Sequence, residues 1–339
     1  MDTITQCLLG ATTSEVGFRR RIGPTATWLA TVSALIPDLD MTLAPFLDEG
    51  SVHLSHRGFS HSLLFSLLVP FALAALFRRF SRCKRYGLLW GCSFVAMLSH
   101  PLLDLCTTYG TRVFSPFSEA RLAWNFIGIV DFVYTPILIL TLVGCAMHRR
   151  WGNPKRTYLM GCLGLALSTA YIGLGAFNHH QAVQLATKRA RDEGHTLIQV
   201  EAYPTIGTIL PWRMVYETSD AFYTGRVNFL HRVPGSFLRL LKSENEWVDR
   251  AEQDPRVQAF REFTMEMERP IYEEQDGRPQ VLFDDMRYAF PLDNPRSLWS
   301  VSVSFHSDGQ IESVRFMNHS RFPSLPQFVR AIWHESFRR

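Results

Sequence analysis

Residues 78–104 read RRFSRCKRYGLLWGCSFVAMLSHPLLD. This stretch begins with five basic residues among its first eight positions, continues with an apolar run from Tyr86 to Leu103, and ends on Asp104. A helix needs about 20 mostly apolar residues to cross a hydrocarbon core of ~30 Å, so the run is long enough to span a membrane. The sequence therefore predicts a membrane helix with a basic end and a His/Asp end.

The same arrangement recurs along the first half of the chain. Twelve of the fifteen Lys and Arg residues before position 178 lie in three clusters, at 19–21, 78–85 and 149–156. Four more runs with few or no charges are Ile22–Pro37, Ser62–Phe77, Leu122–Met147 and Thr157–Asn178. The last two are long enough to span, whereas the first two are short and should end in the membrane interface. We therefore expect a mainly α membrane domain with about five to six membrane-embedded helices.

Basic residues collect in the cytoplasmic loops of membrane proteins. If all three clusters are cytoplasmic, successive runs alternate in direction, and the run Thr157–Asn178 leads to the outer side. The acids and histidine clusters of the first 135 residues then share the outer face. This pattern predicts a multi-pass membrane protein whose C-terminal domain lies on the outer side, which would be the periplasmic side of a bacterial inner membrane.

The second half has an ordinary soluble composition. From His179 onward, twenty basic and twenty-two acidic residues are mixed without a block of like charge. We expect a membrane-embedded domain over 1–178 and a soluble α+β domain over 179–339. Alternation predicts strands at 197–203, 299–306 and 311–317, the last two as a hairpin, and helices are expected at 255–268 and 325–337. The pI of 8.8 comes from the basic loops, so no nucleic-acid surface is predicted.

Two further classes of feature are not expected. All six cysteines lie singly in the first half, which argues against a disulfide framework or a Cys-rich zinc site. The basic cluster before Ile22 begins too late for a signal peptide, and no small-residue cleavage signal follows the run after it.

Four groups of ionisable residues fall at the predicted outward ends of the runs. They are Asp38 and Asp40 in P-D-L-D, His56 and His61 in H-R-G-F-S-H, His100 and Asp104 in H-P-L-L-D, and Asp131 in I-V-D-F-V. An ionisable group at membrane depth costs ~2.5 to 3.5 kcal/mol, so several at one level require compensation. A divalent cation would provide it, because imidazole and carboxylate suit Zn²⁺, Mn²⁺ or Fe²⁺ and paired carboxylates can bridge two ions.

Each motif also has a structural interpretation. Asp38 and Asp40 could form a turn or a helix cap. His100 and Asp104, which share a face if their segment is helical, could form a neutral hydrogen-bonded pair that stabilises the bundle. His53 lies outside the tighter histidine spacing and is expected to be an interfacial or loop residue. The coincidence of all these groups on one face favours a metal site.

Arg57 and Asp131 are the candidate catalytic residues. The planar guanidinium of Arg57 suits a phosphate or carboxylate oxygen, so it could clamp a substrate, or it could support an aspartate of P-D-L-D. Asp131 could instead form a structural ion pair with Arg57, Arg112 or Arg121.

The order of these motifs carries a family resemblance. M-D-T-I-T-Q, P-D-L-D, H-R-G-F-S-H-S-L, H-P-L-L-D, T-Y-G-T, P-F-S and an aspartate followed by Y-T resemble the membrane-bound metal-dependent hydrolase family of the YdjM type, most strongly over residues 1–136. The family's name implies a distant likeness to zinc-dependent phospholipase C and nuclease-type enzymes. Some relatives have His where this chain has Gln6, and many have Pro where it has Phe132. The resemblance implies these metal-site residues, with Asp131 as a further candidate: Asp38, Asp40, His56, His61, His100 and Asp104.

The sequence thus predicts a membrane-bound metal-dependent hydrolase. Its substrate would be a phosphoester or another ester in a membrane lipid or lipid-like molecule, attacked by water that a divalent metal, zinc before manganese or iron, activates. The alternative is a non-enzymatic membrane protein with a structural metal and a partner-binding outer domain. Transport fits less well, because the polar residues gather at one face and do not cross the midplane.

Overall fold

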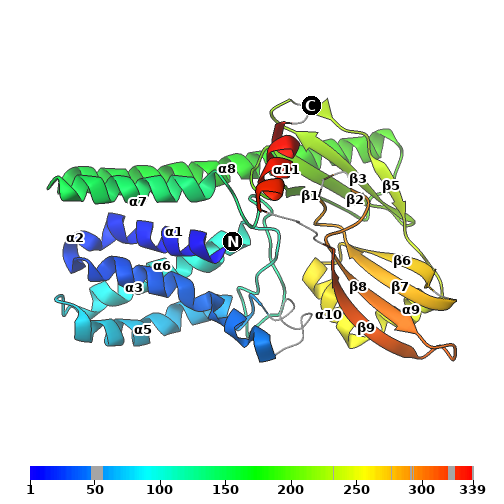
Figure 1. Cartoon of the computed structure of the whole chain (residues 1–339), viewed down its shortest axis with the longest axis horizontal. Helices are drawn as coiled ribbons and strands as arrows, with labels where there is room; N and C mark the ends of the chain where they lie inside the picture. The colour runs from blue at the N-terminus through cyan, green and yellow to red at the C-terminus, as the bar shows by residue number, and fades with distance from the viewer. Residues whose placement is uncertain are drawn as a thin grey trace. The chain divides into compact units, whose positions relative to one another are not determined.

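The computed structural model describes residues 1–46, 56–231, 233–275, 277–290, 292, 294–319 and 325–337. They form two compact units, one from the described residues up to Leu174 and one from Gly175 onward. The first unit is helical and the second contains two antiparallel sheets, so the expected order of a helical part and an α+β part is confirmed (Figure 1). The division falls inside helix α8 (Pro154–Asp192).

Three helices of the chain are long and apolar enough to cross a membrane, among the residues described: α5 (Leu63–Phe80), α6 (Tyr86–Leu105) and α8. The expectation that the run at Ser62–Phe77 is too short is wrong, because α5 continues to Phe80 and reaches 18 residues. The other elements of this unit are α1 (Thr3–Gly17), α2 (Arg19–Ile22), α3 (Thr25–Leu35), α7 (Tyr134–Arg150) and the 3₁₀ segments η1 (Ile36–Phe46) and η2 (Phe59–His61).

The run Leu122–Met147 does not form the single span that its composition predicts. Helix α7 begins only at Tyr134 and has 17 residues. Before it, the backbone of Leu122 pairs with that of Thr111 through N–H···O distances of 2.9 and 3.1 Å. Asp131 then accepts the N–H groups of Val133 and Tyr134, both at 2.8 Å, and so fixes the start of α7. A polar cap inside an apolar run therefore divides it into a loop and a shorter helix.

Small residues let the helices of this unit pack closely. A Cβ atom placed on Gly10 of α1 would lie 2.5 Å from Cβ of Ala34 and 2.8 Å from the carbonyl oxygen of Ala30, both on α3. Ser33 of α3 and Ser93 of α6 are joined by a buried hydrogen bond of 2.7 Å. Close contact through small residues and hydrogen bonds between helices are typical of membrane helix bundles.

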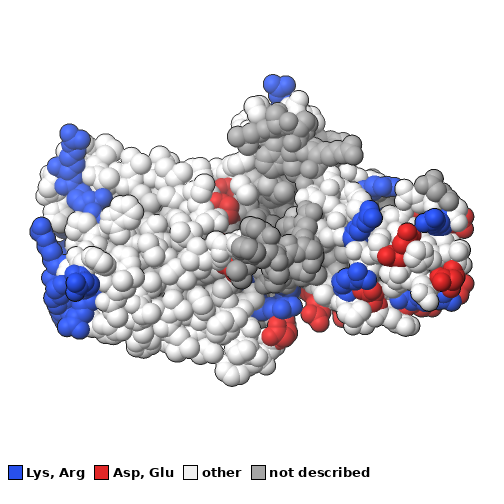
Figure 2. Space-filling model, turned by 60° about the horizontal axis from the view of Figure 1, so that its bottom comes forward, with Lys and Arg blue, Asp and Glu red and all other residues white. Residues whose placement is uncertain are grey.

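The helical unit has a basic end and a polar end. The basic clusters occupy α2, the α5–α6 connection and the α7–α8 connection, and Lys and Arg side chains gather at that end in Figure 2. The opposite end brings together the starts of α1 and α5 and the ends of α3 and α6, as the contact between Thr3 and Asp38 (2.7 Å) illustrates. The chain therefore reverses at each basic cluster, as the charge pattern predicts.

The second unit contains nine strands in two sheets among its described residues. The first sheet has the order β1-β2-β3-β4 with β5 paired to β3, and the second is the meander β6-β7-β8-β9, with every pair antiparallel. The strands are β1 (Gln199–Pro204), β2 (Pro211–Glu217), β3 (Ala221–Asn228), β4 (Val233–Pro234), β5 (Leu238–Leu241), β6 (Glu268–Gln275), β7 (Arg278–Asp285), β8 (Trp299–Phe305) and β9 (Ile311–Asn318). The expected hairpin is confirmed as β8 and β9.

Three more helices belong to this unit: α9 (Glu246–Glu252), α10 (Pro255–Thr264) and α11 (Leu325–Phe337). Helix α10 ends before the predicted limit of residue 268, because Met265 adopts a left-handed conformation (φ 55°) and its N–H group returns to the carbonyl of Arg261. The buried guanidinium of Arg213 on β2 donates to the carbonyls of Met286 (3.0 Å) and Leu292 (2.6 Å). Trp212 is fully buried and is part of the sheet core, as expected.

Candidate metal centre

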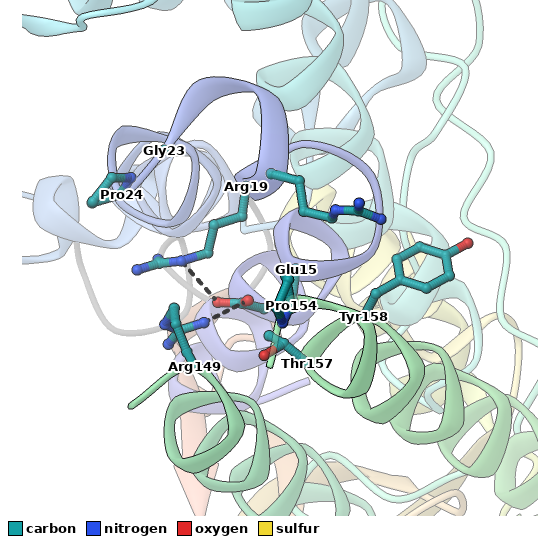
Figure 3. A pocket seen from close by; sticks show the side chains of 9 residues that line it. Glu15, Arg19, Gly23, Pro24, Arg149, Pro154, Thr157 and Tyr158 are labelled. Carbon is teal, nitrogen blue, oxygen red and sulfur yellow. Dashed lines mark hydrogen bonds and ion pairs between the residues drawn. The ribbon is translucent and has the colours of Figure 1, made fainter. Parts of the chain in front are cut away.

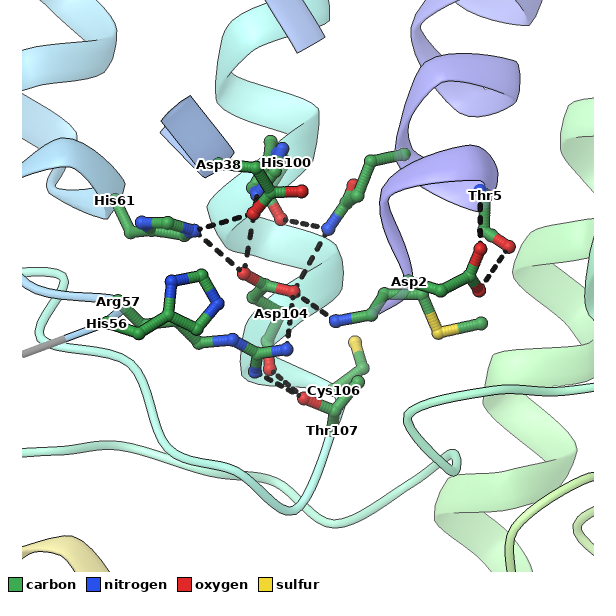
Figure 4. Close-up of polar contacts among 12 residues, drawn as sticks. Asp2, Thr5, Asp38, His56, Arg57, His61, His100, Asp104, Cys106 and Thr107 are labelled. Carbon is green, nitrogen blue, oxygen red and sulfur yellow. Dashed lines mark hydrogen bonds and ion pairs between the residues drawn. The ribbon is translucent and has the colours of Figure 1, made fainter. Parts of the chain in front are cut away.

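Four side chains meet at the polar end of the helical unit (Figure 4). Asp38 comes from η1, directly after the Pro37 that follows α3, and His61 is the last residue of η2. His61 is held at the start of α5 because Ser62 accepts the N–H group of Phe65 at 3.0 Å and caps the helix. His100 and Asp104 lie one turn apart on α6 and share a face, as their spacing predicts.

The distances among these groups are those of ligands around one ion. Nε2 of His61 and Nε2 of His100 each lie 3.3 Å from Oδ1 of Asp38 and 3.5 Å from Oδ2 of Asp104. Two ligand atoms at ~2.05 Å from a tetrahedral zinc ion would be about 3.3 Å apart. All four side chains are buried or nearly so, with exposed fractions of 9% for Asp38, 1% for Asp104 and 0% for the histidines. The ligand atoms of Asp38, His61 and His100 all lie within 4.8 Å of one another, and both imidazole Nε2 atoms also lie 3.5 Å from Oδ2 of Asp104, so the two Nε2 atoms face a point between the two carboxylates.

The hydrogen bonds around the histidines orient the two Nε2 atoms toward that point. Nδ1 of His100 lies 2.6 Å from the carbonyl oxygen of Ala34, which can only accept, so Nδ1 carries the proton. Nδ1 of His61 lies 2.9 Å from the hydroxyl of Ser60, which itself donates to Asp40 at 2.9 Å. A hydrogen bond at one ring nitrogen that leaves the other free is the usual arrangement around a metal-ligating histidine.

Two atoms of this cluster are unsatisfied. Within the described part of the chain, Nε2 of His100 and Oδ2 of Asp104 are buried and have no hydrogen-bond partner. A buried polar atom without a partner costs about 1 to 3 kcal/mol, and more when it is charged. A cation bound between the two atoms would satisfy both of them. The residues present therefore fit a divalent metal ion.

The protonation of the residues outside the membrane helices agrees with this reading. Burial lowers the pKa of His61 to about 4, so the imidazole is neutral near pH 7 and its lone pair is available. Burial alone would raise the pKa of Asp38, but the imidazoles of His100 and His61, whose Nε2 atoms lie 3.3 Å from its Oδ1, outweigh burial and hold that pKa well below its usual range. Asp38 is thus a carboxylate and His61 a neutral base under physiological conditions.

A second group of potential ligands shares His61 with the first. Oδ1 of Asp40 lies 2.9 Å from Nδ1 of His56, and Oδ2 of Asp40 lies 3.6 Å from Nδ1 of His61. The ligand atoms of Asp40, His56 and His61 lie within 4.8 Å of one another, as do those of Asp38, His61 and His100. The second group is less buried, with 21% of the Asp40 side chain and 15% of the His56 side chain exposed.

Arg57 supports Asp104, not the aspartates of P-D-L-D. Its Nη2 lies 3.2 Å from Oδ1 of Asp104, and its Nη1 donates to the hydroxyl of Thr107 at 2.7 Å. The guanidinium also lies 4.7 Å from the ring centre of Tyr109, and only 2% of Arg57 is exposed. Its backbone is left-handed (φ 62°), a strained conformation for a residue with a side chain. The side chain is therefore held on three sides.

Oδ1 of Asp104 accepts further donors from the start of the chain. Gln6 donates to it at 3.0 Å and the amino group of Met1 at 2.5 Å. Gln6 thus contributes to the site through Asp104, whereas Asp2 accepts the N–H and hydroxyl groups of Thr5 at 2.9 and 2.6 Å. Sequence reasoning did not single out Thr107, although its position three residues after Asp104, just beyond the end of α6, is a usable signal.

Asp131 lies outside both groups of potential ligands. Its carboxylate accepts the backbone N–H groups that begin α7, and its Oδ2 accepts the hydroxyl of Tyr171 on α8 at 3.0 Å. These contacts account for a fully buried carboxylate without an arginine. His53 lies outside the described residues.

Comparison with known proteins places the chain in a family. The model of the family described as YdjM inner membrane protein matches residues 1–182, which is more than half of the chain. The chain belongs to the YdjM inner membrane protein family. This family match covers α1 to α7 and most of α8, and so includes every residue of the candidate metal centre.

Two relatives show how far the YdjM similarity extends. The chain is 28% identical over 271 residues to the uncharacterized protein YfhP of Bacillus subtilis, covering 78% of this chain and 77% of the relative. It is 36% identical over 118 residues to the inner membrane protein YbcI of Escherichia coli, covering 33% of this chain and 66% of the relative. No solved structure matches the chain. The chain is therefore a YdjM-family membrane protein with residue groups that could hold a metal ion.

Proposed function

We propose that this YdjM-family protein is a metal-dependent hydrolase of the inner membrane. The observation that carries the proposal is the pair of buried, unsatisfied atoms, Nε2 of His100 and Oδ2 of Asp104, which face Asp38 and His61 at ligand spacing. A divalent ion bound there, zinc before manganese or iron, supplies Lewis-acid chemistry that includes the activation of water at neutral pH. The site then needs no serine or cysteine nucleophile.

In the proposed mechanism, different residues of the site bind the metal, orient its ligands and contact the substrate. Asp38, His61, His100 and Asp104 hold the ion, while the Ser60 hydroxyl and the Ala34 carbonyl orient the two imidazoles. Arg57 is a positioning residue, because its buried guanidinium fixes Asp104 from the side opposite the ligand oxygen. Asp40 and His56, which are more exposed and lie 2.9 Å apart, are the residues that could pass the proton lost by the attacking water to the leaving group.

Exposed apolar side chains next to the ligands support a lipid-like substrate. Leu39, Met41 and Phe59 are 49%, 39% and 48% exposed, and each lies within two residues of Asp38, Asp40 or His61 in the chain. A cluster of carboxylates and histidines flanked by exposed apolar side chains suits a substrate whose ester or phosphoester bond lies at the boundary between acyl chains and headgroups. We therefore favour a membrane lipid or a lipid-like molecule as substrate.

The topology that accompanies this proposal has about five to six membrane-embedded helices, with the metal centre and the C-terminal domain on the periplasmic side. The three basic clusters at one end of the helical unit support it through the excess of Lys and Arg in cytoplasmic loops. Alkaline phosphatase fused after Arg191 should be active and a fusion at Lys84 inactive. The reverse pattern would place the site on the cytoplasmic face.

Metal analysis combined with activity tests the function itself. Full-length protein purified in detergent should contain a divalent metal and hydrolyse a member of a panel of lipid esters and phosphoesters. His61→Ala should lose both, whereas His148→Ala, a change in a histidine near the basic end of α7, should keep both. Loss of metal and of thermal stability without any hydrolysis by the parent would favour the alternative, a structural metal in a non-enzymatic protein.

A further inference from the structure

A cavity at the basic end of the helical unit lies away from the metal centre. It has a volume of about 240 Å³ and is lined by residues of α1, α2, α7 and the start of α8 (Figure 3). Its ionisable lining comprises Arg19, Arg20, Arg149, Glu15 and Tyr158. We propose that this cavity binds the headgroup phosphate of an anionic phospholipid from the leaflet that faces the basic end.

The charge of the cavity favours an anion. Glu15 is the one carboxylate that lines it, and Glu15 is 3% exposed and already paired, with Arg149 at 2.7 Å and Arg19 at 3.5 Å. Figure 3 shows the side chains of Arg19 and Arg149 meeting at Glu15. Three arginines against one carboxylate leave two positive charges uncompensated.

Arg20 is the residue best placed to bind the phosphate. It is exposed, and within the described part of the chain it has no hydrogen bond or ion pair. A guanidinium presents a planar fork of donors that matches two phosphate oxygens. Arg19 and Arg149 pair with Glu15 and form part of the cavity wall. Their charges add to the positive potential of the cavity, while the guanidinium of Arg20 remains available to bind a phosphate.

The surroundings of the cavity favour a lipid over a soluble anion. Leu159, Leu163 and Leu167 follow one another at four-residue spacing on α8 and form an exposed apolar stripe, 53%, 52% and 50% exposed, that begins one residue after the cavity-lining Tyr158. Helix α8 is a candidate membrane span, so this stripe offers an acyl chain an apolar surface along the helix whose first turn lines the cavity. Trp28 of α3 is 70% exposed. Trp and Tyr are typical of the headgroup level, and basic pockets between membrane helices bind lipid headgroups.

Lipid-dependent thermal stability of the full-length protein in a neutral detergent tests this site. Dioleoyl phosphatidylglycerol should raise the melting temperature in a saturable manner, whereas dioleoyl phosphatidylcholine and inorganic phosphate at matched concentrations should not. Arg20→Gln should weaken the apparent affinity for phosphatidylglycerol about fivefold, as expected for one basic residue at a membrane surface. Arg21→Gln is the matched control, because Arg21 is an exposed neighbour on α2 that does not line the cavity.

The other outcomes overturn the proposal. Equal losses in Arg20→Gln and Arg21→Gln would indicate a diffuse basic surface. Equal stabilisation by inorganic phosphate would indicate a soluble anion, and equal stabilisation by phosphatidylcholine would show that charge is not recognised. If Arg20→Gln melts early without lipid, Arg20→Lys keeps the charge and should still bind phosphatidylglycerol more weakly than the parent. Metal content should stay at the parent level in all variants, so this site and the proposed hydrolase fail independently.

Discussion

Arg57 and Asp104 form a buried ion pair in which Nη2 of the arginine lies 3.2 Å from Oδ1 of the aspartate, while Oδ2 has no hydrogen-bond partner in the described part of the chain. The carboxylate thus has one oxygen held by donors and one oxygen facing two imidazoles. This division makes Asp104 both a structural residue and a candidate ligand, and the two roles predict different results in single and double variants.

Asp104→Asn should lose metal and also destabilise the protein. The change leaves the Arg57 guanidinium buried without its counter-charge, which costs about 3 to 5 kcal/mol for a broken buried pair. The double variant Asp104→Asn with Arg57→Met removes both charges and should regain much of the melting temperature without regaining metal. Metal content by mass spectrometry and melting by tryptophan fluorescence measure the two effects. Parent-level metal in either variant would exclude Asp104 as a ligand.

Asp131→Asn is the matched control for Asp104, because it also neutralises a buried aspartate of the helical unit. Its carboxylate accepts the N–H groups that start α7 and the Tyr171 hydroxyl, so the change should lower stability by roughly 1 to 3 kcal/mol. Metal content should not change. A loss of metal would contradict the structural role that these contacts assign to Asp131 and return it to the candidate ligands.

The number of bound ions separates the two ligand groups. We expect one ion per chain, because Nδ1 of His61 is engaged with Ser60, and Ser60 with Asp40, so that this side of the imidazole supports the ligand without binding a second ion. His56→Ala should then keep one ion per chain with about 10- to 100-fold weaker affinity. His61→Ala should keep none. A parent with two ions and a His56→Ala variant with one would instead show a binuclear centre.

Arg57→Lys tests positioning at the site. Lysine keeps the positive charge beside Asp104 but cannot also reach Thr107 with a planar fork. The variant should keep its metal, melt slightly earlier, and lose turnover by a factor that corresponds to about 1 to 3 kcal/mol. Kinetics on a verified substrate, normalised to bound metal, give the comparison. Turnover and melting equal to those of the parent would remove Arg57 from the mechanism.

The C-terminal unit carries a predicted pH dependence at Glu268. Burial raises the pKa of this carboxyl to about 7, and the contacts with Thr264 and Arg261, at 2.5 and 2.9 Å, lower it without outweighing burial. Because the pKa is higher in the folded state than the unfolded value of 4.5, the stabilisation is complete below pH 4.5 and is lost as the pH rises through 7. Glu268→Gln should therefore be no more stable than the parent at pH 4.5 but more stable at pH 8, by roughly 1 to 3 kcal/mol. Unfolding curves whose difference does not change with pH would contradict this.

Local patterns of the sequence predicted much of the helical unit. The basic clusters mark its turns at one end, and the spacing of His100 and Asp104 gives their common face, because both signals depend on neighbours within one or two helical turns. The loop before Tyr134 was missed, because composition alone does not register a cap by Asp131 or the pairing of Leu122 with Thr111. A mean hydropathy is taken over a whole window of residues, so a single polar residue that ends or begins a helix within the window does not show in it.

The site was predictable in its residue types but not in its pairings. Arg57 could have supported any nearby carboxylate, and nothing local to H-R-G-F-S-H selects Asp104, which lies 47 positions further along the chain. The hydrogen bond between Nδ1 of His100 and the carbonyl of Ala34 joins α6 to the end of α3. Every residue has a backbone carbonyl, so the residue type at position 34 does not identify it as the acceptor. Contacts of this kind follow from how the helices pack.

The ligands of the candidate metal centre come from three separate segments, η1, η2 and α6. During synthesis, the first of them emerges from the ribosome well before the last, and the set is complete only when α6 has joined α3 and α5 in the bundle. The proposed metal would therefore be bound only after these three segments have been placed, so the metal content of a purified variant would also report whether its helices have assembled correctly.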